Sequence, residues 1–175
     1  MQPLAPELTA KLARIKLLSL DVDGVLTDGR LVYNSDGSES KAFNTQDGYA
    51  LKTLAATGVK LAIISGRKSL MVERRAAELG IDALYQGFED KTIALTELMQ
   101  KTQTDAVHIA HAGDDLPDLA LFDRVGCALS VSDAHPLVRS QADLISSLPG
   151  GQGAVRELCE RIMIAQGTWP HQNRV

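Results

Sequence analysis

Short apolar segments alternate with amphipathic segments along most of this chain of 175 residues. Segments with the length and branching of buried strands lie at 15–20, 59–64, 82–86, 106–110 and 125–129, with a weaker one at 143–146. Between them the sequence predicts helices at 47–57, 68–79, 90–102, 115–122, 134–140 and 153–166. Strands that alternate with helices favour a parallel sheet covered by helices on both faces. We therefore predict an α/β fold of three layers.

The composition is that of an ordinary globular protein, with 45% hydrophobic and 23% charged residues, so we predict one domain over 1–175. A net charge of -4 argues against a nucleic-acid partner, and no apolar run is long enough for a membrane span. Residues 1–14 lack the apolar core of a secretory signal. Cys127 and Cys159 are in no metal-binding spacing and indicate small buried residues in a reducing compartment, so we expect a cytoplasmic protein.

One segment, 29–43, interrupts the alternation. Asp36-Gly37 is a strong signal for a hairpin turn between two short strand-like runs. A decorative surface loop is the simpler interpretation. The aromatic residues Tyr33 and Phe43 instead indicate that this hairpin insert packs on a neighbouring subunit or on the rim of a site.

Two carboxylates follow the first predicted strand, in the stretch Asp21-Val22-Asp23-Gly24. Successive side chains of an extended chain point to opposite faces, so a turn at Gly24 is needed to bring both to one site. Like charges this close are costly unless a cation or a shared proton relieves them, and Mg²⁺ prefers carboxylate oxygens. The alternative is a strand that ends in a polar turn, where Asp is common.

Three later segments place polar side chains in similar positions. Ser65-Gly66 follows the second strand, where it can bind an anion or cap a helix. Lys91 lies at a helix start, where a cation opposes the helix dipole, although an exposed surface lysine is the simpler interpretation. The carboxylates of Asp114, Asp115 and Asp118, which follow Gly113, again indicate a bound cation. The alternative is that they only interact favourably with the dipole of a helix that begins there. The ligand spacing of an EF-hand is absent.

As an ordered set, these motifs resemble the haloacid dehalogenase (HAD) superfamily of phosphotransferases. Further segments resemble one family within it, the 3-deoxy-D-manno-octulosonate 8-phosphate phosphatases; they are 28–29, 41–44, 47–48, 64–67, 84–87, 133–136 and 150–157. The resemblance implies a Rossmann-like sandwich of the capless type with a small hairpin insert. It also implies Mg²⁺ dependence, a homotetramer, and the removal of phosphate from a sugar acid phosphate in lipopolysaccharide precursor synthesis.

The resemblance also implies roles for individual residues. Asp21 would be the nucleophile, Asp23 the general acid and base, and Ser65 and Lys91 would contact the phosphoryl oxygens. Mg²⁺ would be held by Asp21, the Asp23 carbonyl and Asp114. Asp115 and Asp118 would support these ligands without binding the metal, and Asp118 would orient Lys91. The implied substrate-binding residues are Asp23, Asn44, Thr45, Gln46, Asp47, Gly48, Lys52, Arg67, Arg75 and Lys91.

Lys52 and Gln152 stand where this family often has Arg, which leaves the sugar-acid contacts open. Gly150-Gly151 could be part of a flexible turn before the last helix, or could belong to a C-terminal segment that reaches an active site. The tail, 167–175, then reads as a closing segment anchored by Trp169. His108 and His111 read as structural residues.

Three rival functions remain. The first is a phosphatase for another sugar acid phosphate, such as a nine-carbon one. The second is a non-catalytic oligomerisation module of the same fold, which would have no use for the full set of Asp21, Asp23, Ser65, Lys91 and Asp114. The third is a phospho-accepting receiver domain, whose motif order differs and which needs no proton donor at Asp23.

Overall fold

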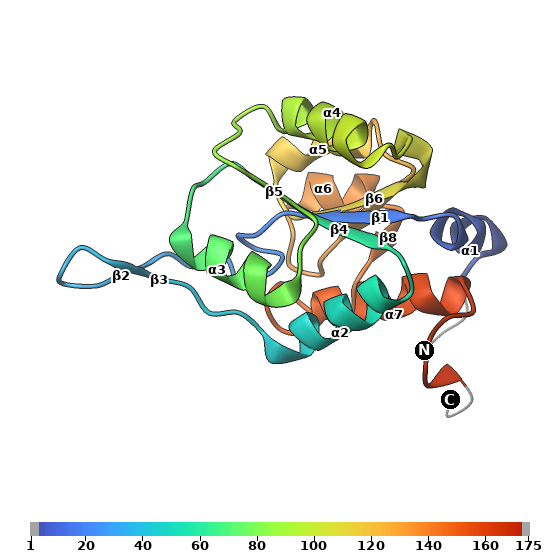
Figure 1. Ribbon diagram of the computed structural model, residues 1–175, viewed down its shortest axis with the longest axis horizontal. Helices are drawn as coiled ribbons and strands as arrows, with labels where there is room; N and C mark the ends of the chain where they lie inside the picture. The colour runs from blue at the N-terminus through green and yellow to red at the C-terminus, as the bar shows by residue number, and fades with distance from the viewer. Residues whose placement is uncertain (1–3, 173–175) are drawn as a thin grey trace.

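A single sheet of six parallel strands forms the centre of the protein within residues 4–172, the part of the chain that the computed structural model describes (Figure 1). The strands are β1 (Leu17–Leu20), β4 (Lys60–Ser65), β5 (Ala83–Gln86), β6 (Ile109–Gly113), β7 (Cys127–Ser130) and β8 (Leu144–Ile145). Their order in space is β5-β4-β1-β6-β7-β8, so the chain builds first on one side of β1 and then on the other. This change of direction opens a crevice at the carboxyl end of β1, where ligands bind in such sheets.

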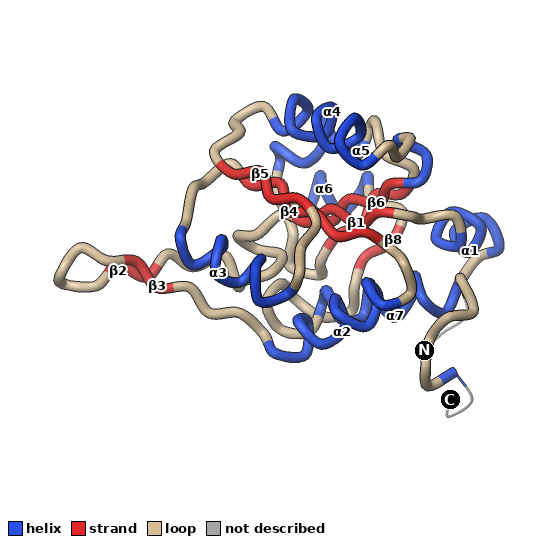
Figure 2. The backbone as a smooth tube through the Cα atoms, in the orientation of Figure 1, coloured by secondary structure: helices blue, strands red, loops and turns tan. Residues whose placement is uncertain are grey.

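Helices cover both faces of the sheet, which confirms the predicted three-layer α/β fold (Figures 1 and 2). One face carries α1 (Pro6–Ala13), α2 (Thr45–Ala56), α3 (Leu70–Leu79) and α7 (Ala154–Ala165). The other face carries α4 (Lys91–Thr102), α5 (Leu119–Phe122) and α6 (Pro136–Gln141). No helix in residues 4–172 has the length and apolar character that crossing a membrane would require.

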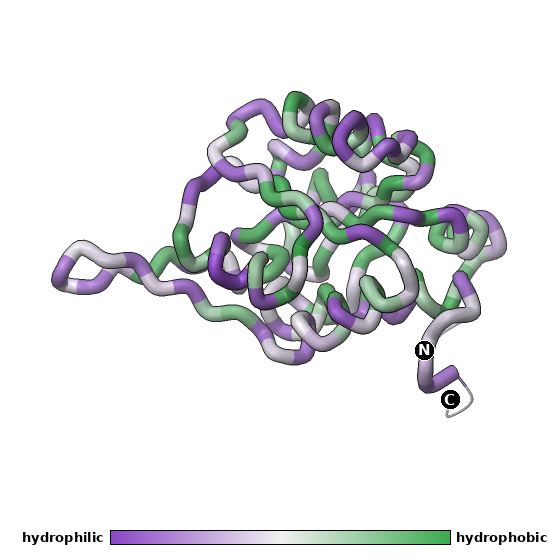
Figure 3. The backbone as a smooth tube through the Cα atoms, in the orientation of Figure 1, coloured by the Kyte–Doolittle hydropathy of each residue, from purple (hydrophilic) through white to green (hydrophobic). Residues whose placement is uncertain are grey.

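The core follows from the alternation of side chains along the central strands. In β4, Leu61 and Ile63 pack toward α2 and α7, while Ala62 and Ile64 pack toward α4. A strand buried on both faces is apolar in both side-chain directions, as residues 61–64 of β4 are. In Figure 3 the hydrophobic segments gather in the sheet and on the helices that cover it. Each fully buried leucine or isoleucine contributes roughly 1.5–3 kcal/mol. Cys127 and Cys159 are buried free thiols in this core, as predicted.

Three details differ from the sequence-based prediction. The helix α1 was not predicted; its leucines pack against α7, and Pro6 occupies its first turn. The strand expected at 106–110 begins only at Ile109, because a 3₁₀ turn, η1 (Ala106–His108), precedes it. The helix expected at 115–122 is divided into η2 (Leu116–Asp118) and α5.

The predicted hairpin is present and projects from the body of the protein (Figures 1 and 2). Its strands, β2 (Val32–Tyr33) and β3 (Glu39–Ser40), are antiparallel, and the turn between them places Gly37 at φ 84°. The side chain of Phe43, at the base of the hairpin, packs against the core, whereas Tyr33 is 67% exposed. The hairpin contacts the body through Phe43 at its base and through the contacts of Tyr33 and Glu39 with Arg67, whereas residues 34–38 at its turn are exposed.

Candidate active site

The carboxyl ends of β1, β4 and β6 meet at one edge of the sheet and surround a cavity of about 550 Å³. Among the residues predicted to form a site, those that line this cavity are Asp21, Asp23, Ser65, Arg67, Lys91, Asp114, Asp115 and Asp118. Asp21 is held at the end of β1 by its backbone N–H, which donates to Ala112 O at 2.9 Å. Parallel pairing of the strands thus gathers groups that lie far apart in the sequence.

Three of the carboxylates at this edge are close enough to share a cation. One oxygen each of Asp21, Asp114 and Asp118 lies within 4.8 Å of the others. Asp118 is already engaged, because one oxygen contacts Lys91 and the other accepts from the backbone N–H groups of Asp114 and Asp115. Asp21 and Asp114 are therefore the carboxylates that remain able to bind a cation.

The surroundings of Asp114 favour a bound cation. Its Oδ1 is buried and has no hydrogen-bond partner among the described residues. Burial, and then the charges of Asp21 and Asp118, raise the pKa of Asp114 to about 8. A hard divalent cation bound by oxygen ligands would satisfy this atom and offset these charges, so the donor set fits Mg²⁺.

Gly24 allows Asp114 to approach the loop that follows β1. Its φ is +95°, and a Cβ at this position would lie 2.0 Å from Asp114 Oδ2. The backbone N–H groups of Val25, Leu26 and Thr27 all donate to Val22 O, which makes the tight turn expected at Gly24.

Lys91 is buried, with 5% of its side chain exposed, and not a surface lysine. Its Nζ lies 3.1 Å from Asp21 Oδ1 and 2.6 Å from Asp118 Oδ1. Although burial opposes the charge, these two carboxylates raise the pKa of Lys91, so it remains cationic. The ammonium group lies between them and next to the cavity, where it can contact an anion.

Asp118 receives a second contact, from His111, which sequence reasoning assigned only a structural place. The ring of His111 is fully buried, with Nε2 3.1 Å from Asp118 Oδ1 and Nδ1 2.9 Å from Ser19 Oγ. Although burial opposes ionisation, the hydrogen bond and charge of His111 and the charge of Lys91 lower the pKa of Asp118. Alternation along β6 puts His111 on a defined face, but nothing in the sequence indicates that Asp118 will meet it.

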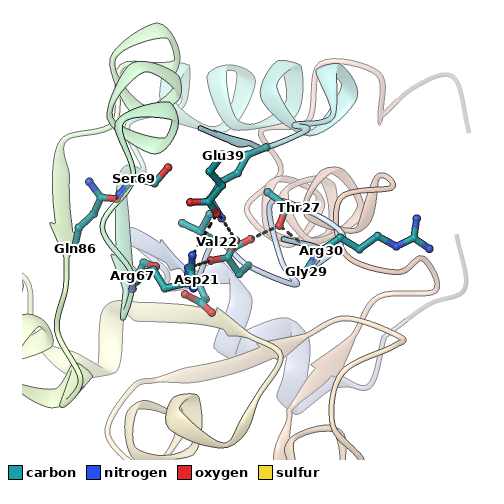
Figure 4. Close-up of polar contacts among 12 residues, drawn as sticks. Asp21, Val22, Thr27, Gly29, Arg30, Glu39, Arg67, Ser69 and Gln86 are labelled. Carbon is teal, nitrogen blue, oxygen red and sulfur yellow. Dashed lines mark hydrogen bonds and ion pairs between the residues drawn. The ribbon is translucent and has the colours of Figure 1, made fainter. Parts of the chain in front are cut away.

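Ser65 ends β4 and is buried at the cavity. Its hydroxyl oxygen accepts from Arg67 N at 3.3 Å. It does not cap α3, because that position belongs to Ser69, whose backbone N–H donates to Gln86 Oε1 at 2.9 Å (Figure 4). Asp115 is a helix cap: its Oδ1 accepts from Leu116 N at 2.8 Å, and it forms a capping box with Asp118.

Asp23 lies in a cluster of charged groups that connects it to the hairpin. Its Oδ1 forms an ion pair with Lys41, and its Oδ2 lies 3.7 Å from Arg67 Nε. Glu39 pairs with both cations: it lies 3.6 Å from Lys41 and 3.3 Å from Arg67. Figure 4 shows where Glu39 and Arg67 lie. Sequence reasoning assigned no site role to Glu39 or Lys41. The signal available is their i, i+2 spacing, which puts both on one face of the extended chain.

The other residues predicted to bind substrate lie away from this cavity. Asn44 caps α2, and Thr45, Gln46, Asp47 and Gly48 form its first turn. The carboxyl group of Asp47 is buried against α7, where its Oδ1 accepts from Arg156 N at 2.8 Å.

Lys52 and Arg75 line a separate hollow of about 490 Å³. Arg75 donates to Asn44 O at 3.2 Å, and a Cβ at Gly48 would lie 2.2 Å from its Nη2. In one copy of the chain, these residues support α2 and do not face the acidic cluster.

The segment before α7 is packed and not a flexible turn. A Cβ at Gly150 would lie 1.7 Å from Gly24 O, and Gly151 N donates to Val25 O at 3.0 Å. Beyond α7, the side chain of Trp169 packs against the core. The described chain after α7 lies at the end of the molecule opposite the hairpin (Figure 1). The described part of the tail therefore does not close the cavity of its own copy; residues 173–175 of the predicted tail lie outside the described part.

Known proteins resemble this chain over nearly its whole length. The model of the haloacid dehalogenase-like hydrolase family matches residues 84–157. The 3-deoxy-D-manno-octulosonate 8-phosphate phosphatase of Salmonella typhimurium is 44% identical over 165 residues, which cover 94% of this chain and 88% of that relative.

Solved structures of this family also resemble the chain. The 3-deoxy-D-manno-octulosonate 8-phosphate phosphatase from Moraxella catarrhalis, in complex with magnesium ion, phosphate ion and KDO, has a TM-score of 0.90 and 48% identity, and covers 92% of each chain. A probable YrbI family phosphatase from Pseudomonas syringae has a TM-score of 0.93 and 49% identity, and covers 97% of each chain.

Proposed function

Because the chain belongs to the 3-deoxy-D-manno-octulosonate 8-phosphate phosphatase family of haloacid dehalogenase-like hydrolases, we propose that it is a Mg²⁺-dependent phosphatase. Its substrate is 3-deoxy-D-manno-octulosonate 8-phosphate, and its products are the free sugar acid and phosphate. This reaction belongs to lipopolysaccharide precursor synthesis in the cytoplasm. The observation that carries the proposal is the meeting of Asp21, Lys91 and Asp114 at one cavity, in a chain 48% identical to a relative with magnesium, phosphate and KDO bound.

The cation would be held by the carboxylates of Asp21 and Asp114 and the backbone carbonyl of Asp23. When bound, Mg²⁺ offsets the negative charge of nucleophile and phosphate and orients the phosphoryl group. Lys91 and the hydroxyl group of Ser65 contact the phosphoryl oxygens, Lys91 as a point charge. The contact of Asp118 with Lys91 fixes the direction in which the ammonium group points.

The reaction then takes two steps. A carboxylate oxygen of Asp21 attacks phosphorus and forms an aspartyl-phosphate, while the bond from phosphorus to the sugar oxygen breaks. Asp23 gives its proton to that leaving oxygen. In the second step Asp23 takes a proton from water, whose oxygen attacks phosphorus and releases phosphate and free Asp21.

A phosphate-release assay across sugar acid phosphates, with and without Mg²⁺, tests the proposal. The eight-carbon substrate should give the highest kcat/KM, and chelation of the metal should abolish release. A preference for a nine-carbon substrate would support the alternative that Lys52 and Gln152 raise, because both replace the arginine often found in the family. No release from any sugar phosphate would support a non-catalytic oligomerisation module.

We further propose that the protein is a homotetramer assembled through the hairpin. Leu31, Val32 and Tyr33 are 41%, 49% and 67% exposed on a two-stranded hairpin, which is marginally stable in water unless it packs against other structure. Burial of these side chains against neighbouring copies would stabilise the hairpin. The same assembly would bring further side chains to the rim of an open site, including cations such as Lys52 that lie away from the cavity of their own copy.

A further inference from the structure

The buried ammonium group of Lys41 contacts Asp23 and has no place in the reaction proposed above. Only 1% of the Lys41 side chain is exposed, although the residue follows β3 at the base of a projecting hairpin. A buried lysine is costly unless carboxylates compensate it, and here Asp23 Oδ1 and Glu39 Oε1 do so. This arrangement is a built ion-pair cluster and not a chance surface contact.

Lys41 cannot act by touching the substrate directly. The cavity is lined by Asp23 and Arg67, whereas Lys41 is not among its lining residues and is almost fully covered. The contact of Lys41 is with the side of Asp23 that faces the hairpin. Lys41 therefore acts on the reaction through the side chains it contacts, of which Asp23 is the one that faces the cavity.

The two oxygens of Asp23 are held from two directions. Lys41 contacts Oδ1, and Arg67 lies 3.7 Å from Oδ2. Glu39 pairs with both cations and offsets one of the two positive charges beside Asp23. Removing Lys41 would leave Oδ1 without its cation and Glu39 with only Arg67 as its counter-charge.

We propose that Lys41 is a positioning residue for proton transfer: it holds the carboxyl group of Asp23 in the orientation from which Asp23 protonates the leaving oxygen. The inference rests on the proposed function, because it requires that Asp23 be the general acid. It also links the hairpin to catalysis, because Glu39 and Lys41 belong to the hairpin insert whose other strand carries Val32 and Tyr33. A shift of the hairpin base would move the group that orients the acid.

The test compares Lys41→Met with Lys41→Arg on two substrates, 3-deoxy-D-manno-octulosonate 8-phosphate and an aryl phosphate such as 4-nitrophenyl phosphate. The value of kcat/KM reports the steps through formation of the aspartyl-phosphate, in which the leaving group departs. A sugar oxygen needs a proton to leave, whereas nitrophenolate does not, and general acid catalysis contributes about 10²–10⁴-fold. Lys41→Met should lower kcat/KM about 10–100-fold on the sugar phosphate and less than about threefold on the aryl phosphate. Lys41→Arg should restore most of the loss.

Two controls separate positioning from general damage. Lys11→Met removes a lysine that pairs with Asp143 at 2.6 Å, away from the cavity, and should leave both substrates unaffected. In an Asp23→Asn background, Lys41→Met should cost less than about twofold further, because residues that act as a unit are not additive. Light scattering and thermal unfolding of each variant show whether mass or fold has changed, and Lys41→Gln replaces Lys41→Met if the latter does not fold.

Equal losses on both substrates, or a full further loss in the Asp23→Asn background, would overturn the inference while leaving the phosphatase proposal intact. Failure of the proposed function has a different signature, because the unmodified protein would then release phosphate from neither substrate in the presence of Mg²⁺. That result would overturn both proposals together.

Discussion

Asp21 combines burial, an adjacent cation and a position at a strand end, and these features identify it as the nucleophile we propose. Asp21→Asn should keep the fold, because the amide has nearly the same volume and can still accept from Lys91 Nζ, 3.1 Å away. It should lower kcat by about three orders of magnitude or more, since an amide is a poor nucleophile; that loss corresponds to ~4 kcal/mol of barrier. Phosphate release by variant free of wild-type enzyme measures the effect, with circular dichroism as the control for folding. Turnover within tenfold of wild type would show that another group attacks phosphorus.

A second prediction at this scale concerns Asp114. Its pKa is raised from 3.8 to about 8, so without metal the folded state binds a proton that the unfolded state has lost. The metal-free protein should therefore lose stability as the pH rises from about 4 to about 8. Asp114→Asn removes this loss and should raise the free energy of unfolding at pH 7 without Mg²⁺ by roughly 1–3 kcal/mol.

Thermal unfolding with and without Mg²⁺ checks this prediction. The metal should raise the Tm of the wild-type protein and leave that of Asp114→Asn nearly unchanged, because a neutral amide is a weak replacement for a carboxylate ligand. Asp90→Asn is the matched control, since Asp90 caps α4, does not line the cavity, and Asn is an equally good cap. An unchanged response of Asp114→Asn to Mg²⁺ would place the cation elsewhere.

Among the elements, α4 ends with a residue in an unfavourable conformation. Gln103, at its C-terminus, has φ 52°, in the left-handed region that glycine tolerates best. Gln103→Gly should raise the free energy of unfolding by about 0.5–1 kcal/mol, measured by urea denaturation. Gln103→Ala separates strain from the side-chain hydrogen bond to Gln100 O: it removes that bond, keeps the strain and should destabilise the protein. A less stable Gln103→Gly would show that this hydrogen bond outweighs the strain.

Local patterns in the sequence were sufficient to predict most elements and the centre of the site. The buried strands are mainly apolar, and Asp21, Ser65 and Asp114 lie at or just after the carboxyl ends of three of them, so a parallel sheet brings these residues to the same edge. The missed element, α1, has eight residues and is marginal by itself; it is stabilised by packing on α7, which no local signal reveals.

Contacts between distant segments could not be predicted in this way. Lys41 meets Asp23 because the base of the hairpin lies against the loop after β1, and His111 meets Asp118 because η2 places Asp118 beside β6. Asp47 shows the same limit: it lies in a segment that resembles a substrate-binding one, yet its carboxyl group receives Arg156 N from the first turn of α7. Local sequence patterns predict where a strand ends and which polar residues follow it. The residue that a buried side chain contacts depends instead on how whole helices and strands pack together.

At the scale of the whole molecule, the hairpin lies at one end and the described part of the tail at the other (Figure 1). The cavity lies beside the hairpin insert, because Gly29 and Leu31 line it. A chain built this way has an open site, and its described tail is too far away to cover it. The exposed hairpin side chains Val32 and Tyr33 lie at the same end of the molecule as this open site. Assembly through the hairpin would therefore stabilise the hairpin and enclose the site in one step.

The last prediction follows from this arrangement. Light scattering of the unmodified protein should give about four times the chain mass of 18.8 kDa. Replacing Val32 and Tyr33 by Ser should lower both the mass and the activity, because the apolar area that these residues bury between copies is lost. Ile93→Ser with Val107→Ser is the matched control: these residues are 52% and 42% exposed on α4 and η1, and their replacement should change neither quantity. A monomeric wild-type protein with full activity would rule out assembly as a requirement, and the open cavity of a single copy would then be the complete site.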